Sequence, residues 1–151
     1  MDVAGRLREL GISLPTVAPP IASYIPVVVA GNLAFVSGQI GRRGDHVLFR
    51  GHVGDTVSVE QGAQAAREGA LSALAAMNAE GLLDRIVRVV KVTGFVASAR
   101  GFADQPKVVN GASDLLVQVF GEPGKHARSS VGVAELPLGA PVEVEFVFEI
   151  R

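Results

Sequence analysis

Two side chains near the C-terminal end of the sequence could together bind and hydrolyse a small organic acid. Arg128 opens one β-rich segment, and Glu143 lies early in the next. A guanidinium binds a carboxylate through two parallel hydrogen bonds, and a nearby carboxylate can hold or activate water. The turn LPLGAP joins the segments, so antiparallel pairing would bring Arg128 and Glu143 together. The pattern equally fits a surface arginine and a solvated strand face carrying Glu143, Glu145 and Glu149.

Residue types that other kinds of active site require are absent or wrongly spaced. There is no cysteine, which excludes disulfide bonds, thiolate metal sites and cysteine nucleophiles. The histidines, His46, His52 and His126, do not have the spacing of zinc ligands. No Walker loop, dinucleotide-binding glycine motif or G-x-S-x-G motif occurs. We therefore expect neither a metal nor a cofactor.

The composition predicts one domain spanning residues 1–151, with a short helix and an extended arm over residues 1–19. Hydrophobic residues make up 48% of the chain and aromatic residues only 5%, so the core must be mainly aliphatic. The net charge is −1 and the basic residues are scattered, which argues against a nucleic-acid or membrane-binding surface. The N-terminal sequence MDVAGRLREL lacks the apolar core of a signal peptide. We expect a cytoplasmic protein, which suits the absence of cysteine.

Hydrophobic periodicity and turn residues predict the elements that must position these side chains. The first helix, over 2–10, precedes an extended stretch, SLPTVAPP, over 13–20. A hairpin then pairs 24–29 with 33–37 around a turn at 30–32. A long helix begins at a capping box formed by Ser58 and Gln61 and ends at Gly81. Further on we expect strands at 46–49, 86–96, 129–136 and 142–150, and a helix from Asp104 to 120 with Pro106 in its first turn.

The strand over 86–96 is apolar on both of its expected faces, with Val87, Val89 and Phe95 on one and Val90, Val92 and Val96 on the other. Both faces should therefore be buried. Two long helices can cover only one face of a sheet. We predict an α+β sandwich, a mixed β-sheet with both long helices on one face, and expect another copy of the chain to meet the other face.

The motifs and their order resemble those of the RidA/YjgF family of small trimeric proteins, whose best-known members are enamine/imine deaminases. The segment ARSSVGVAELPLGAPVEVE over 127–145 is similar to the family's C-terminal motif. SGQIG over 37–41 is similar to its early Ser-Gly-Gln motif, and VVKVTGFVAS and VVNGASDLL resemble its central strand and second helix. The resemblance runs from about residue 20 to the end. It implies a chorismate-mutase-like fold and a homotrimer with clefts between subunits.

The resemblance also implies roles for individual residues. Arg128 corresponds to the arginine that clamps the substrate carboxylate, and Glu143 to the glutamate that holds the attacking water. Ser130 stands where family deaminases often carry a cysteine, and a backbone group could serve the same purpose. An N-terminal helix and a longer loop over 41–55 indicate a longer branch of the family with an undefined substrate. The remaining pocket-lining positions are Tyr24, Ser37, Gly38 and Asn110.

These pocket-lining residues also have purely structural interpretations. Tyr24 could cover the edge of the core, and Ser37 and Gly38 could shape the end of a strand. Asn110 could simply face solvent on its helix.

Three functions are compatible with the family resemblance. The first is hydrolysis of reactive enamines or imines to 2-keto acids and ammonia, in which the pocket supplies proximity more than strong acid–base power. The second is a binding module that senses a small carboxylate without turning it over. The third is a ribonuclease or translation inhibitor. The sequence supports the third little, because the chain is slightly acidic, has one tyrosine and no tryptophan, and carries no basic stripe.

Overall fold

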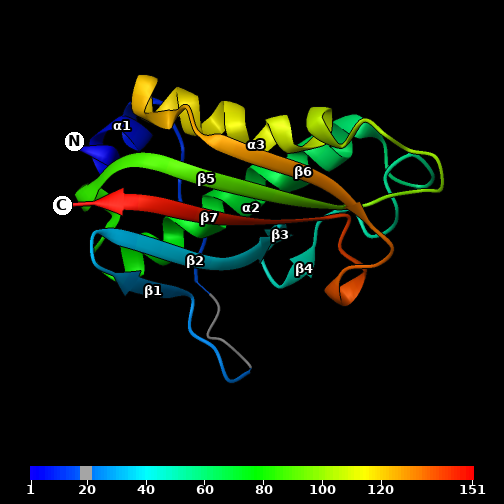
Figure 1. Cartoon of the computed structure of the whole chain (residues 1–151), viewed down its shortest axis with the longest axis horizontal. Coiled ribbons are helices and arrows are strands. Elements are labelled where there is room, and N and C mark those ends of the chain that lie inside the picture. Colours follow the sequence, from blue (N-terminus) through cyan, green and yellow to red (C-terminus); the bar gives the residue numbers. More distant parts are fainter. Residues whose placement is uncertain (18–21) are drawn as a thin grey trace.

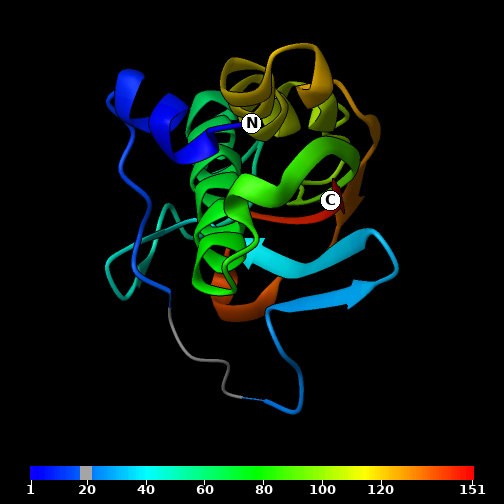
Figure 2. The same ribbon diagram turned by 90° about the vertical axis from the view of Figure 1, so that its left-hand side faces the viewer.

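The computed structural model describes residues 1–17 and 22–151, and its centre is a five-stranded mixed sheet with the strand order β1-β2-β7-β5-β6. Helices α2 and α3 lie side by side on one face of this sheet, which we call the helix face (Figures 1 and 2). The predicted α+β sandwich is therefore confirmed. The elements in chain order are α1 Val3–Glu9, β1 Val27–Ala30, β2 Leu33–Ile40, β3 Arg42–Arg43, β4 His46–Val47, α2 Val59–Ala79, β5 Ile86–Ala97, α3 Gln105–Phe120, β6 Ala127–Val133 and β7 Val142–Ile150.

The N-terminal part of the chain largely follows the prediction. The first helix forms, and residues 13–17 adopt no helix or strand, while 18–20 of the predicted extended stretch lie outside the described residues. The hairpin of β1 and β2 also forms, but β1 begins only at Val27, so Tyr24 precedes the sheet. The predicted strand over 46–49 is shorter than expected, and it pairs as β4 with β3 in a separate two-stranded ribbon.

Helix α2 begins at the predicted capping box. The Ser58 hydroxyl accepts a hydrogen bond from the Gln61 backbone at 3.1 Å, and the Gln61 side chain accepts one from the Ser58 backbone at 3.0 Å. The glycines of α2 permit close packing against its neighbours. A Cβ at Gly69 would lie 3.1 Å from the Gln39 carbonyl, and one at Gly62 would lie 3.0 Å from Val108. The helix can therefore sit directly on the sheet and against α3.

Helix α3 buries one apolar stripe along its length. Asp104 precedes the helix, but its side chain makes no capping hydrogen bond and instead pairs with Lys107 at 3.6 Å. Pro106 occupies the first turn as predicted. The buried residues are Val108, Val109, Ala112, Leu115, Leu116, Val119 and Phe120.

The expected antiparallel pairing of the last two strands is wrong. Strand β6 pairs in parallel with β5, and β7 pairs with β5 on the opposite side, so β5 separates them. The reason is the strand–helix–strand order of β5, α3 and β6, because a helical crossover returns the chain to the same end of the sheet and makes parallel neighbours. The turn at LPLGAP then carries the chain past β5 rather than folding it into a hairpin.

The predicted faces of β5 are also wrong in part. Val89 is buried, whereas Val87 is 41% exposed, although both were assigned to one face. The pairing of β5 with β7 shifts register twice, between Ile86 and Arg88 and between Val89 and Lys91. Each shift inserts a residue and moves the following side chains to the other face.

The face of the sheet opposite α2 and α3, which we call the open face, carries apolar side chains that no other described residues cover. Burial alternates along β7, with Val142, Val144, Phe146, Phe148 and Ile150 buried on the helix face. The intervening residues of β7 therefore project from the open face. Beside them lie Val28, Phe35 and Val131, which are 50%, 44% and 43% exposed.

Candidate functional site

Arg128 lies near the start of β6 and points toward helix α3. Its register partner on β5 is Val92, which is fully buried on the helix face. The Arg128 Nη1 donates hydrogen bonds to Asn110 Oδ1 at 2.7 Å and to Ser113 Oγ at 3.1 Å, and Nη2 approaches the Pro106 carbonyl at 3.4 Å. Three acceptors from one helix thus hold the guanidinium between β6 and α3.

This arrangement leaves one edge of the Arg128 guanidinium available for a ligand. Both Nη1 hydrogens are used by Asn110 and Ser113, and one Nη2 hydrogen faces Pro106. Within residues 1–17 and 22–151, Nε–H finds no acceptor, and the contact from Nη2 to the Pro106 carbonyl is long. In a guanidinium, Nε–H and the Nη2–H on the same side point in the same direction, which is the geometry that binds both oxygens of a carboxylate. The fold therefore presents Arg128 as half of a bidentate pair.

Ser130 follows Arg128 by two residues and shares its side of β6. Its register partner, Gly94, is buried beneath Val109 of α3. The Ser130 hydroxyl is itself buried and has no hydrogen-bond partner among the described residues. A buried polar group of this kind calls for a partner, and a ligand held by Arg128 could supply one.

Glu143 projects from the open face of β7, because its neighbours Val142 and Val144 are buried on the helix face. Its carboxylate lies over Gly38 of β2, where a Cβ would collide with Glu143 Oε1. Partial burial raises the pKa of Glu143 above its ordinary value, and the nearby negative charge of Glu145 raises it further. Both effects make the Glu143 carboxylate a better proton acceptor.

Ser37 precedes Gly38 on β2, and Tyr24 lies near Ser37 in the segment ahead of the edge strand β1. The Ser37 hydroxyl donates a hydrogen bond to the Ile25 carbonyl at 2.8 Å, and the Ser37 backbone donates one to the Pro26 carbonyl at 2.9 Å. These bonds hold the segment that carries Tyr24 against β2. Tyr24 and Ser37 both line a shallow depression of about 630 Å³, together with Ala22, Ser23, Ile25 and Val28.

Arg128 and Glu143 do not meet within one chain. They lie two strands apart, and through β5 Arg128 aligns with Phe146, three residues from Glu143. Strand spacing and rise put their Cα atoms roughly 14 Å apart, and the side chains project from opposite faces. One chain therefore carries two separate groups of candidate site residues. We call them the arginine half-site (Arg128, Asn110, Ser113, Ser130) and the glutamate half-site (Glu143, Gly38, Ser37, Tyr24).

Two residues of this region were not singled out from the sequence as site residues. Ser113 accepts a hydrogen bond from Arg128, and its oxygen lies 2.9 Å from His126 Nε2. The spacing of these residues could have indicated the contacts, because Asn110 and Ser113 are one turn apart on a helix, and His126 and Arg128 are two residues apart where an extended segment enters β6. Each pair must therefore lie on one side of its element.

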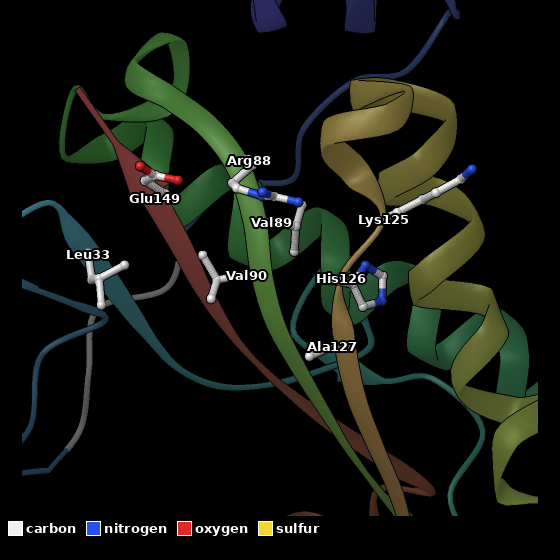
Figure 3. Close-up of a pocket in the computed structure, with 8 residues that line it drawn as sticks. All are labelled: Leu33, Arg88, Val89, Val90, Lys125, His126, Ala127 and Glu149. Carbon is white, nitrogen blue, oxygen red and sulfur yellow. The ribbon is translucent and has the colours of Figure 1, made fainter.

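A second depression, of about 610 Å³, opens at the other end of the sheet from Glu143. Figure 3 shows Arg88 extending from β5 toward β6, with the His126 ring on the facing wall and Glu149 on β7. Among the described residues no three metal-ligating side chains converge here or elsewhere, and no described helix is long and apolar enough to cross a membrane.

The fold and sequence have clear relatives among known proteins. A family model described as "YjgF/chorismate mutase-like, putative endoribonuclease" matches residues 4–150. Protein TCP17 of Trypanosoma cruzi is 45% identical over 151 residues, covering 99% of this chain and 94% of that protein. A 2-iminobutanoate/2-iminopropanoate deaminase of Dermatophagoides farinae is 34% identical, over 93% of this chain and 95% of that protein.

Solved structures agree with the sequence comparisons. The crystal structure of the Agrobacterium tumefaciens protein Atu1372, of unknown function, has a TM-score of 0.88 and 43% identity, covering 98% of this chain and 91% of that one. The class that the fold defines is therefore the YjgF/chorismate-mutase-like sandwich. Because the family model spans nearly the whole sequence, the chain belongs to the RidA/YjgF family.

Proposed function

We propose that this protein hydrolyses reactive enamine or imine intermediates to 2-keto acids and ammonia. The observation that carries the proposal is the open Nε–Nη2 edge of Arg128, which fits the carboxylate that such intermediates bear. The 34%-identical relative named as a 2-iminobutanoate/2-iminopropanoate deaminase supports this class of substrate.

Imine hydrolysis requires the protein mainly to position the substrate and the attacking water. Water adds to the imine carbon, a proton passes to the nitrogen, and ammonia leaves as the carbonyl forms. Glu143 accepts the proton of the attacking water and passes it to the nitrogen, a role that its raised pKa favours. Arg128 fixes the carboxylate next to the reacting carbon. Ser130, with its unpaired hydroxyl, Asn110, Tyr24, Ser37 and Gly38 line the pocket.

The two half-sites work together only when a second copy of the chain supplies one of them. Within one chain, Arg128 and Glu143 project from opposite faces of the sheet. The open face carries the exposed apolar side chains of Val28, Phe35 and Val131, which are suited to burial against another copy. The proposed assembly is a homotrimer with three clefts, each combining the arginine half-site of one subunit with the glutamate half-site of its neighbour.

A coupled assay tests the function directly. An amino-acid oxidase generates the imine in place, and formation of the 2-keto acid is followed with and without the protein. Acceleration by the folded oligomer is the expected result. No acceleration, combined with thermal stabilisation by 2-oxobutanoate, would instead indicate a carboxylate-binding module. The absence of both acceleration and thermal stabilisation would contradict both functions.

The pH dependence of the reaction should report the environment of Glu143. If the ionised carboxylate is the base, kcat/KM falls as pH drops through its raised pKa. Glu145 contributes to that raised pKa through its negative charge. The Glu145→Gln variant should therefore move the acid limb of the pH profile to lower pH.

Glu149→Gln is the matched control for this experiment, because Glu149 lies on the same strand but is not among the groups that shift the Glu143 pKa. Its acid limb should stay at the wild-type position. Equal acid limbs in wild type and Glu145→Gln would show that Glu143 is not the group that titrates.

A further inference from the structure

We propose that Ser113 and His126 are positioning residues that hold Arg128 with its Nε–Nη2 edge free for a carboxylate. This proposal rests on the proposed function, because it takes Arg128 as the carboxylate ligand. It adds Ser113 in the middle of α3 and His126 just before β6 to the arginine half-site, of which the family resemblance implied Arg128, Asn110 and Ser130.

In a neutral His126, the hydrogen bonds around the ring have only one consistent direction. His126 Nδ1 lies 2.6 Å from the Gly124 carbonyl, which can only accept, so Nδ1 carries the proton. In the neutral ring Nε2 must then accept, and it lies 2.9 Å from Ser113 Oγ. Ser113 therefore donates its hydrogen to His126. Its lone pairs remain free to accept from Arg128 Nη1 at 3.1 Å.

The series of hydrogen bonds from His126 through Ser113 to Arg128 fixes the guanidinium more firmly than Asn110 does alone. The Arg128 bond to Asn110 lies at an exposed position, whereas the bond to Ser113 is partly buried. Water can replace an exposed amide but reaches a partly buried hydroxyl less readily. The ring of His126 prevents the Ser113 hydroxyl from rotating toward other acceptors. The result is a guanidinium whose plane is set by two bonds to Nη1.

The charges around His126 favour its neutral form. Partial burial lowers the pKa of His126, and the positive charge of Arg128 lowers it further, although the bond to Gly124 opposes them. The other charged groups at the same wall are Lys125 on its own segment, Arg88 on β5 and Glu149 on β7. Lys125 is itself paired with Glu122 at 2.6 Å, so burial and the charge of Arg128 are the effects that favour the neutral ring.

A Ser–His pair could instead be a nucleophile and its base, but the surroundings of Ser113 do not suit that role. Ser113 lies in the middle of α3, where the backbone N–H groups are committed to helical hydrogen bonds. Acyl transfer needs free donors beside the nucleophile to stabilise an oxyanion. The positioning role accounts for the contacts without that requirement.

Binding of 2-oxobutanoate, measured by calorimetry, and steady-state imine hydrolysis test the proposal together. Ser113→Ala should weaken binding and raise KM by about tenfold, the scale of one hydrogen bond to a charged group. The kcat value should change by less than about twofold, because Ser113 does not touch the reacting atoms. Ser113→Thr keeps the hydroxyl and should restore binding, and Ser72→Ala, on α2 outside the site, should behave as wild type.

A double-mutant cycle separates positioning from a general structural effect. In an Arg128→Lys background, Ser113→Ala should cause no further loss of binding, because the group that it positions is gone. His126→Ala should raise KM in the wild-type background, and His46→Ala, at an exposed histidine on β4, should not. Equal losses from Ser113→Ala in both backgrounds would overturn the proposal.

A readout without ligand keeps this test independent of the proposed function. Nitrogen-15 NMR of the His126 ring in the wild-type oligomer should show the Nδ1–H tautomer, with an Nε2 shift that changes in Ser113→Ala. An Nε2–H tautomer, or an Nε2 shift that stays the same in Ser113→Ala, would refute the proposed hydrogen bond from Ser113 to His126. If the wild-type protein neither binds 2-oxobutanoate nor hydrolyses imines, the proposed function fails. The NMR result then decides by itself whether Ser113 and His126 position Arg128.

Discussion

Replacing Arg128 by alanine should abolish measurable binding of 2-oxobutanoate and lower kcat/KM for imine hydrolysis by at least about a hundredfold. The expected size follows from losing two charge-assisted hydrogen bonds to a carboxylate in a partly buried groove. Calorimetry gives the binding constant, and the coupled oxidase assay gives the rate.

The controls for this variant use the chain's other cations. Arg128→Lys keeps the charge but loses the planar fork, so its binding should fall between those of wild type and alanine. Arg88→Ala removes an exposed arginine from β5 and should leave kcat/KM unchanged. Circular dichroism must show that Arg128→Ala still folds, because Arg128 also ties β6 to α3. A folded Arg128→Ala protein with wild-type affinity would remove Arg128 from the site.

The Glu143→Gln variant should lower kcat by about a hundredfold or more, the usual contribution of a general base. Binding of 2-oxobutanoate should change by no more than about threefold, because the carboxylate of the ligand is held by Arg128. Single-turnover rates and calorimetry on the same preparation separate the two effects. A drop in affinity with kcat preserved would assign Glu143 to binding instead of proton transfer.

Gly38→Ala tests the same carboxylate without changing it. The added Cβ would collide with Glu143 Oε1 and push the side chain from its place on the open face. The kcat value should fall as it does in Glu143→Gln, although the glutamate is still present. Wild-type kcat in Gly38→Ala would show that the position of Glu143 does not matter for the reaction.

Local patterns predicted the elements well, and long-range pairing less well. The stripe on α3 and the alternation on β7 each arise from burial against one neighbour, which the periodicity of a single segment records. The faces of β5 could not be read in this way, because its register shifts depend on how β7 pairs with it. Nothing in the run of valines signals those shifts.

The pairing of Arg128 with Glu143 was expected for a reason that the structure does not support. Adjacent strands in the sequence were taken as partners, but the helical crossover of α3 places β6 beside β5 and away from β7. The contact between Arg128 and Asn110 is local to this crossover, and both residues lay among the predicted site positions. The link through Ser113 and His126 was missed because His126 was considered only as a metal ligand.

The central claim is that Arg128 of one subunit and Glu143 of a neighbour act in one cleft, and mixing two inactive variants tests it most directly. Arg128→Ala and Glu143→Gln proteins are unfolded together in equal amounts, refolded, and assayed for imine hydrolysis. In a cyclic oligomer assembled at random, about a quarter of the clefts should then combine an intact arginine with an intact glutamate. The account predicts recovery of about a quarter of wild-type activity. Activity no higher than that of the separate variants, in a mixture shown to have exchanged subunits, would contradict it.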